Sequence, residues 1–142
     1  MSKMVFAALA GAALVLSVSA LAAAQTASTG VFSKAQADHG AQIYADTCAR
    51  CHGASMEGLD VAPPLTGPRF LGNWINQPVA ALAVRIRTSM PLDMPGTLGL
   101  SDSAVLAAAI LSANGYPAGS TDMPTSPAQL QQLTIDAPPS GK

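Results

Sequence analysis

The sequence predicts a small all-α domain, and three observations support this prediction. Apolar residues recur at helical spacing over 34–47, 79–88 and 102–113. No segment shows the alternation of apolar and polar residues that is typical of a half-buried strand. A C-x-x-C-H motif at residues 48–52 follows the first helical segment. The chain of 142 residues is long enough for one domain of this kind after a targeting segment is removed.

The C-x-x-C-H motif is typical of a c-type haem attachment site. Cys48 and Cys51 would form thioether bonds with the haem vinyl groups, and His52 would ligate the iron. Because two residues separate the cysteines, both thiols can reach one porphyrin edge from a single helical turn. A disulfide would leave His52 without a role, and a zinc site needs about four ligands, whereas outside the motif the chain offers only His39. The motif therefore predicts one covalently attached haem c.

Residues 1–24 have the features of a secretory signal peptide. Lys3 supplies a positive charge, an apolar stretch follows it, and residues 22–24 form a small-residue cleavage site before Gln25. The alternative is an uncleaved anchor, since the apolar run is just long enough to span a bilayer. Either alternative places the functional domain outside the cytoplasm, in the periplasm. We predict no membrane span after cleavage and a flexible lead-in over 25–32.

The first helix is predicted over 34–47, with Ser33 as its N-cap. Gly40 inside this helix costs about 1 kcal/mol relative to alanine, which suggests that it permits a close helix–helix crossing. The helix leads into the haem motif. Residues 53–70 are rich in glycine and proline and predict an irregular wrap.

The second helix is predicted over 79–88, and Pro78 suits its first position. Residues 90–99 contain two Met-Pro pairs, which predict a loop.

The third helix is predicted over 102–113, with Ser101 as its cap. Asn114-Gly115 is expected to end it with a left-handed residue. In the tail, 126–133 is a possible short helix, and the last residues, 137–142, are predicted to be mobile.

Composition excludes several classes of function. The chain carries a net charge of −1 and has no basic patch for nucleic acid or charged amphipathic stretch for a membrane surface. Only two lysines follow residue 24, so we do not expect a lysine collar that steers the protein toward an acidic partner. Docking is expected to be apolar and short-ranged. Aromatic residues are also few, so the porphyrin is expected to fill part of the core.

The sixth position of the haem iron needs a ligand, and methionine raises the potential and closes the iron to added molecules. The candidates after residue 24 are Met56, Met90, Met94 and Met123. Met56 is too near His52 to reach the opposite face, and Met123 lies beyond the last core helix. We favour Met90, directly after the second helix, with Met94 as the alternative. A histidine, His39, could also serve, although we expect it on a solvated helix face.

Other residues are candidates for contacts with the haem or with its histidine. Pro63 or Pro64 could place a backbone carbonyl against the second nitrogen of His52, which would fix the tautomer and raise the basicity of the imidazole. Trp74 and Arg69 could donate hydrogen bonds to the haem propionates. Trp74 as an ordinary core residue is an equal alternative.

With these residues identified, the chain resembles class I cytochromes c. More narrowly, it resembles the cytochrome c subunits or domains of bacterial pyrroloquinoline-quinone-dependent alcohol dehydrogenases. The resemblance covers about 33–119 and makes 120–142 a C-terminal extension. It rests on Gly40-x-x-x-Tyr44-x-x-x-Cys48-x-x-Cys51-His52-Gly53, Ala62-Pro63-Pro64-Leu65-x-Gly67, Phe70-Leu71-x-x-Trp74, Ile86-Arg87-x-Ser89-Met90-Pro91, Pro95-Gly96 and Asn114-Gly115-Tyr116-Pro117-Ala118-Gly119.

The resemblance implies that Met90 is the distal ligand and that the first and last core helices cross at Gly40 and Tyr44. Ala109 stands where the family usually has an aromatic residue, so we expect the crossing to be looser or filled by the tail. A quinoprotein dehydrogenase as electron donor and a downstream oxidase or cytochrome of the respiratory chain are the implied partners.

The leading hypothesis is therefore one-electron transfer by a carrier that is not itself an enzyme, either a free shuttle or the electron-transfer subunit of a dehydrogenase complex. A small peroxidase-like haem enzyme is an alternative, but it would need a distal acid or base, and the chain offers no strong candidate beyond His39. A gas-binding haem protein with an open sixth site is the other alternative.

Overall fold

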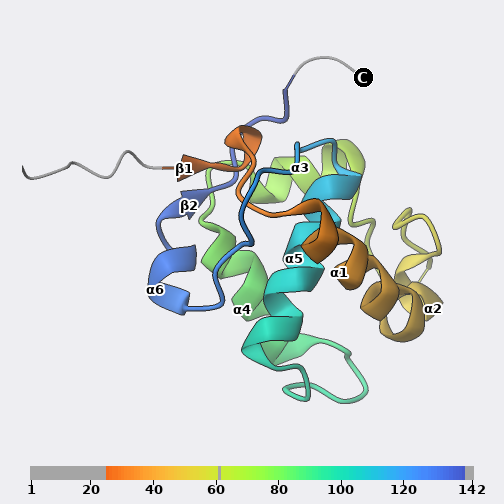
Figure 1. Ribbon diagram of the computed structural model, residues 1–142. Helices are drawn as coiled ribbons and strands as arrows, with labels where there is room; N and C mark the ends of the chain where they lie inside the picture. Colours follow the sequence, from red (N-terminus) through yellow and green to blue (C-terminus); the bar gives the residue numbers. More distant parts are fainter. Residues whose placement is uncertain (1–24, 61, 140–142) are drawn as a thin grey trace, which may run out of the picture.

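The computed structural model describes residues 25–60 and 62–139, and within them helices dominate (Figure 1). The predicted signal peptide lies outside the described residues. The elements are β1 (Gln25–Thr26), a 3-10 turn η1 (Ala27–Thr29), α1 (Lys34–Thr47), α2 (Ala49–His52), α3 (Gly67–Trp74), α4 (Val79–Ser89), α5 (Leu100–Ala113), α6 (Pro127–Leu130) and β2 (Leu133–Thr134). The predicted all-α class is confirmed. No helix among these described residues combines the length and apolar character needed to cross a membrane.

Helices α1 and α5 lie against each other (Figure 1), and Gly40 lets their backbones approach closely. A Cβ atom added at Gly40 would lie 1.9 Å from the carbonyl oxygen of Val105 and 3.0 Å from the Cβ atom of Ala109. The expected role of Gly40 in a close crossing is confirmed. The small side chain of Ala109 is buried in the same contact, so the crossing is tight where looseness was one expectation.

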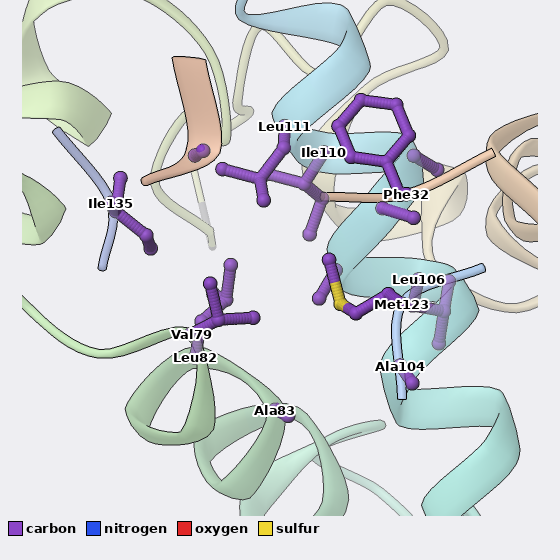
Figure 2. Close-up of a cluster of buried hydrophobic side chains, with 14 of the residues drawn as sticks. Phe32, Val79, Leu82, Ala83, Ala104, Leu106, Ile110, Leu111, Met123 and Ile135 are labelled. Atoms are coloured by element: carbon purple, nitrogen blue, oxygen red, sulfur yellow. The ribbon is translucent and has the colours of Figure 1, made fainter. Parts of the chain in front are cut away.

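The tail completes the core, as Figure 2 shows. Met123 and Ile135 lie in the same buried cluster as Phe32, Val79 of α4 and Leu106 of α5. The tail therefore supplies the core with apolar volume that the few aromatic residues do not.

The prediction of a flexible lead-in over 25–32 is wrong. β1 pairs in parallel with β2, with Gln25 opposite Leu133 and Thr26 opposite Thr134. Ala27, Val31 and Phe32 are buried. This order comes from pairing with a segment more than 100 residues away, which local sequence cannot reveal.

The C-terminal extension is also anchored to the rest of the domain. At the residue before this extension, the amide nitrogen of Gly119 donates to the carbonyl oxygen of Phe32 at 2.7 Å. The side-chain amide of Gln36 forms two hydrogen bonds with the backbone of Met123. It donates to the carbonyl oxygen at 2.9 Å and accepts from the amide at 2.7 Å. Residues 33–119 and the tail after them therefore share one core.

Two helix starts differ from prediction. Ser33 caps α1 as expected, accepting from the amide of Gln36 at 3.1 Å. Gly99, rather than Ser101, is the N-cap of α5, and the carboxylate of Asp102 accepts from its amide at 3.2 Å. The acidic side chain in the first turn replaces the hydroxyl cap that the sequence suggested. Pro78 likewise precedes α4 as its N-cap instead of occupying the first helical position.

Helix α3 was not predicted, because Gly67 and Pro68 resemble the loop that precedes them. Proline is favourable in the first helical turn, where its missing amide donor would have no partner anyway. Phe70 then fixes the helix by burial against the core. The short helix expected over 126–133 is present as α6, and Gly115 ends α5 with a left-handed backbone angle of +85°.

Substituting Gly40 by alanine is expected to destabilise the protein by about 1–3 kcal/mol, because the new methyl group overlaps the Val105 carbonyl. Gly72→Ala is the matched control, since a Cβ atom at Gly72 in α3 meets no atom within 4 Å. The control should lose no stability and gain up to about 1 kcal/mol. Denaturant unfolding of both haem-loaded variants measures this, and equal stability of the two would contradict a tight crossing.

The stability of the tail contact is expected to depend on pH through Asp136. Partial burial acts against its charge, but hydrogen bonds from Ser28 (backbone amide at 2.9 Å, and hydroxyl) hold the pKa of Asp136 below the ordinary value of 3.8. Because the pKa of Asp136 is lower in the folded protein than in the unfolded chain, its carboxylate stabilises the fold at pH values above the unfolded pKa. This stabilisation is lost as the pH falls through the pKa of the folded protein.

Asp136→Asn should therefore lower stability at neutral pH and flatten the acid limb of a plot of unfolding free energy against pH. Asp46→Asn, on the exposed side of α1, is the control and should leave that limb unchanged. An unaltered acid limb in Asp136→Asn would contradict this role for the carboxylate.

Candidate functional site

The two cysteines lie on one turn between α1 and α2, residues 48–52, which we call the attachment turn. Cys48 is both the C-cap of α1 and the N-cap of α2. Its carbonyl oxygen accepts from the amides of Cys51 at 3.1 Å and His52 at 3.0 Å. Both thiols are free and partly exposed. Burial raises the pKa of the Cys48 thiol, against an opposing effect of the Arg50 charge.

The ring of His52 is oriented by a backbone carbonyl. Its Nδ1 lies 2.8 Å from the carbonyl oxygen of Pro63, and the residue is 7% exposed. Because a carbonyl oxygen only accepts, Nδ1 carries the proton, and in the neutral imidazole Nε2 is then the nitrogen that can ligate a metal. Of the two prolines considered from the sequence, Pro63 is the one whose carbonyl makes this contact.

Tyr44 fixes the glycine that follows the motif. Its hydroxyl donates to the carbonyl oxygen of Gly53 at 2.6 Å, in a buried position. Burial, with smaller effects of Cys48 and Glu57, raises the pKa of Tyr44 to about 12, so the hydroxyl keeps its proton at any physiological pH. The end of α1 and the attachment turn are therefore joined by a side chain as well as by the backbone.

The loop of residues 53–66 is closed at its base. The amide of Leu65 donates to the carbonyl oxygen of Met56 at 2.9 Å, and the amide of Gly58 donates to that of His52 at 2.7 Å. The side chain of Asn114 reaches this base from the end of α5 and bonds to Leu65 and Gly67. This role of Asn114 could not be predicted from the sequence, because Asn-Gly at a helix end is already explained as a C-terminal cap.

The loop of residues 90–99, which carries Met90 and Met94, is joined to the attachment turn by an ion pair. Met90 directly follows α4, with its amide donating to the carbonyl oxygen of Ile86 at 3.0 Å, and it is half-buried. Met94 is 55% exposed. Between them, Asp93 forms an ion pair with Arg50 of the C-x-x-C-H motif, at 2.6 Å between Oδ2 and Nη2. This pair holds the pKa of Asp93 below its ordinary value through the hydrogen bond from Arg50.

The remaining candidates are spread around the domain. Met56 and Met123 are buried in the apolar core, and His39 is exposed on α1 as expected. Trp74 is half-buried against Phe70, with 6.1 Å between the ring centroids. Arg69 is exposed on the same helix.

These residues fit a covalently attached haem. Two free thiols lie on one turn. A buried imidazole has Nδ1 held by the Pro63 carbonyl, which leaves Nε2 to ligate a metal. The half-buried apolar side chains of Leu65, Trp74 and Leu98 pack on the edge of the core. Such partly covered groups are ones that a porphyrin can bury further.

The comparisons with known proteins agree with this chemistry. A family described as "Cytochrome C oxidase, cbb3-type, subunit III" matches residues 35–109, more than half of the chain. The chain belongs to this family. It is therefore a class I c-type cytochrome with a covalently attached haem c, and its haem serves electron transfer.

A solved structure supports the fold of this cytochrome. A chain in the crystal structure of the sulfane dehydrogenase SoxCD from Paracoccus pantotrophus aligns with a TM-score of 0.52 at 24% sequence identity, covering 89% of this chain and 67% of that chain. At this identity the match concerns the fold alone. No curated protein matches the cytochrome. The narrower resemblance to alcohol dehydrogenase subunits gains no support from these matches and stays a prediction.

Tyr44→Phe is expected to cost about 1–2 kcal/mol, because the buried carbonyl of Gly53 loses its donor. Amide hydrogen exchange at His52 and Gly53 should become faster in this variant. Tyr116→Phe is the control, since its hydroxyl donates to the carbonyl of Asp136 in the tail. The control should lose stability without faster exchange in the attachment turn. Equal exchange in both variants would contradict a local role for Tyr44.

Proposed function

We propose that this cytochrome is a one-electron carrier whose haem iron is ligated by His52 and Met90. The single observation that carries the proposal is the hydrogen bond between Nδ1 of His52 and the Pro63 carbonyl, which leaves Nε2 to the iron. A bound haem supplies one redox-active iron and a porphyrin edge through which an electron enters and leaves. The protein's part is to hold the ligands in place and to keep the iron closed to other molecules.

The position and burial of Met90 favour it over Met94 as the sixth ligand. Met90 is half-buried at the end of a regular helix, whereas Met94 is mostly exposed. The ion pair between Arg50 and Asp93 holds the loop that carries both methionines near the C-x-x-C-H motif and does not distinguish between them. A ligand on a fixed helix end needs less rearrangement to reach the iron than one within the exposed loop.

We also propose that the carrier works in the periplasm, delivered there by the signal peptide predicted over residues 1–24. A quinoprotein alcohol dehydrogenase or a similar dehydrogenase is the proposed donor, and an oxidase or another cytochrome is the proposed acceptor. The motif around Met90 and the Asn114-Gly115 segment support the donor. The name of the matched family, which is that of an oxidase subunit, agrees with the acceptor.

Met90→Ala is expected to abolish the weak far-red absorption band of methionine-ligated ferric haem and to let the reduced protein bind carbon monoxide. Met94→Ala is the matched control and should retain the band and exclude carbon monoxide. Optical spectra of the two purified variants make the measurement. The reverse result would assign the ligand to Met94.

The unchanged protein provides the test between function classes. A low-spin spectrum that is insensitive to carbon monoxide is expected for a carrier. A high-spin spectrum that shifts with carbon monoxide would contradict the proposal and favour a peroxidase-like enzyme or a gas-binding protein.

A further inference from the structure

We propose that Asn114 is a positioning residue for His52, acting through the base of the 53–66 loop. This inference rests on the proposed function, because it takes His52 as a ligand of the haem iron. The side-chain hydrogen bonds of Asn114 go to Gly67, Leu65 and Ile110 and not to the imidazole of His52. Asn114 acts on the backbone segment that carries the Pro63 carbonyl.

The side-chain amide of Asn114 uses both of its ends. Its Oδ1 accepts from the amide of Gly67 at 3.0 Å, and its Nδ2 donates to the carbonyl oxygens of Leu65 at 2.9 Å and Ile110 at 2.8 Å. Two of these bonds join α5 to a segment 47 and 49 residues earlier in the chain. The third attaches the side chain to its own helix, so the loop is held against a rigid support.

This support lies close in sequence to the histidine's partner. Pro63 is separated from Leu65 by a single residue, Pro64, whose ring restricts the backbone. Leu65 is further fixed by the hydrogen bond that its amide donates to the carbonyl oxygen of Met56. Restraining Leu65 and Gly67 therefore restrains the position of the Pro63 carbonyl relative to Nδ1 of His52.

The position of that carbonyl has a chemical consequence. A strong hydrogen bond from Nδ1 makes the imidazole more basic, and a more basic ligand stabilises the oxidised iron over the reduced iron. When the bond is loosened, the reduced state is favoured and the reduction potential rises. Asn114 is therefore expected to keep the potential lower than a free loop would allow.

Asn114→Ser is the sharpest test, with Asn114→Ala beside it. A serine hydroxyl at this position can donate to the Ile110 carbonyl four residues earlier in the helix, but it is too short to reach Leu65 and Gly67. The serine variant thus keeps the helix contact and loses the two contacts to the loop.

Two readouts follow the histidine itself in the haem-loaded protein. Exchange of the Nδ1 proton of His52, followed by NMR, should become roughly threefold to tenfold faster in both variants. The reduction potential should rise in both. Leu130→Ala is the control for general destabilisation, because Leu130 is buried in α6 and belongs to the tail. It should lower stability without changing either readout.

The outcomes separate the possibilities. Faster exchange and a higher potential in the serine and alanine variants, but not in Leu130→Ala, support the positioning role. A loss of stability without a change in either readout would overturn it, and the serine variant decides this if Asn114→Ala does not fold. Failure of the proposed function is recognised separately, since the unchanged protein would then lack a low-spin spectrum with the methionine band.

Discussion

The crossing of α1 and α5 at Gly40 is the constraint on which the haem site depends. The backbone of α1 lies against the carbonyl of Val105 without an intervening side chain, so the two helices have one close register. The far end of α1 then carries Cys48, and the far end of α5 carries Asn114. The 53–66 loop begins after α2, which follows α1, and its other end is hydrogen-bonded to Asn114. A shift of either helix would therefore move the thiols relative to the carbonyl that orients His52.

Much of this arrangement could be predicted from local sequence. The segments of α1, α4 and α5 show helical spacing, and the C-x-x-C-H motif limits the cofactor to one chemistry. The sequence offered Pro63 and Pro64 as the residues whose carbonyl could meet His52. The structure selects Pro63. Each of these features depends on residues close together in the chain.

The features that were missed depend on distant residues or on ambiguous ones. The lead-in is ordered only because β1 meets β2, and Asn114 bonds to residues almost fifty positions earlier. Helix α3 begins with Gly67-Pro68, a pair that is common in loops and equally suited to a first helical turn. The burial of Phe70 against the core, rather than the residues at its N-terminus, stabilises this helix.

The central claim is that Cys48 and Cys51 fasten one haem to the attachment turn. Mass spectrometry tests this most directly. The protein is produced and exported in cells that contain the haem-attachment machinery, and it is denatured in acid before the mass is measured. We expect the mass to be increased by one haem that stays attached after denaturation, and this attachment to be lost when both cysteines are changed to alanine. A protein that carries no haem, or that releases it intact on denaturation, would contradict covalent attachment through Cys48 and Cys51.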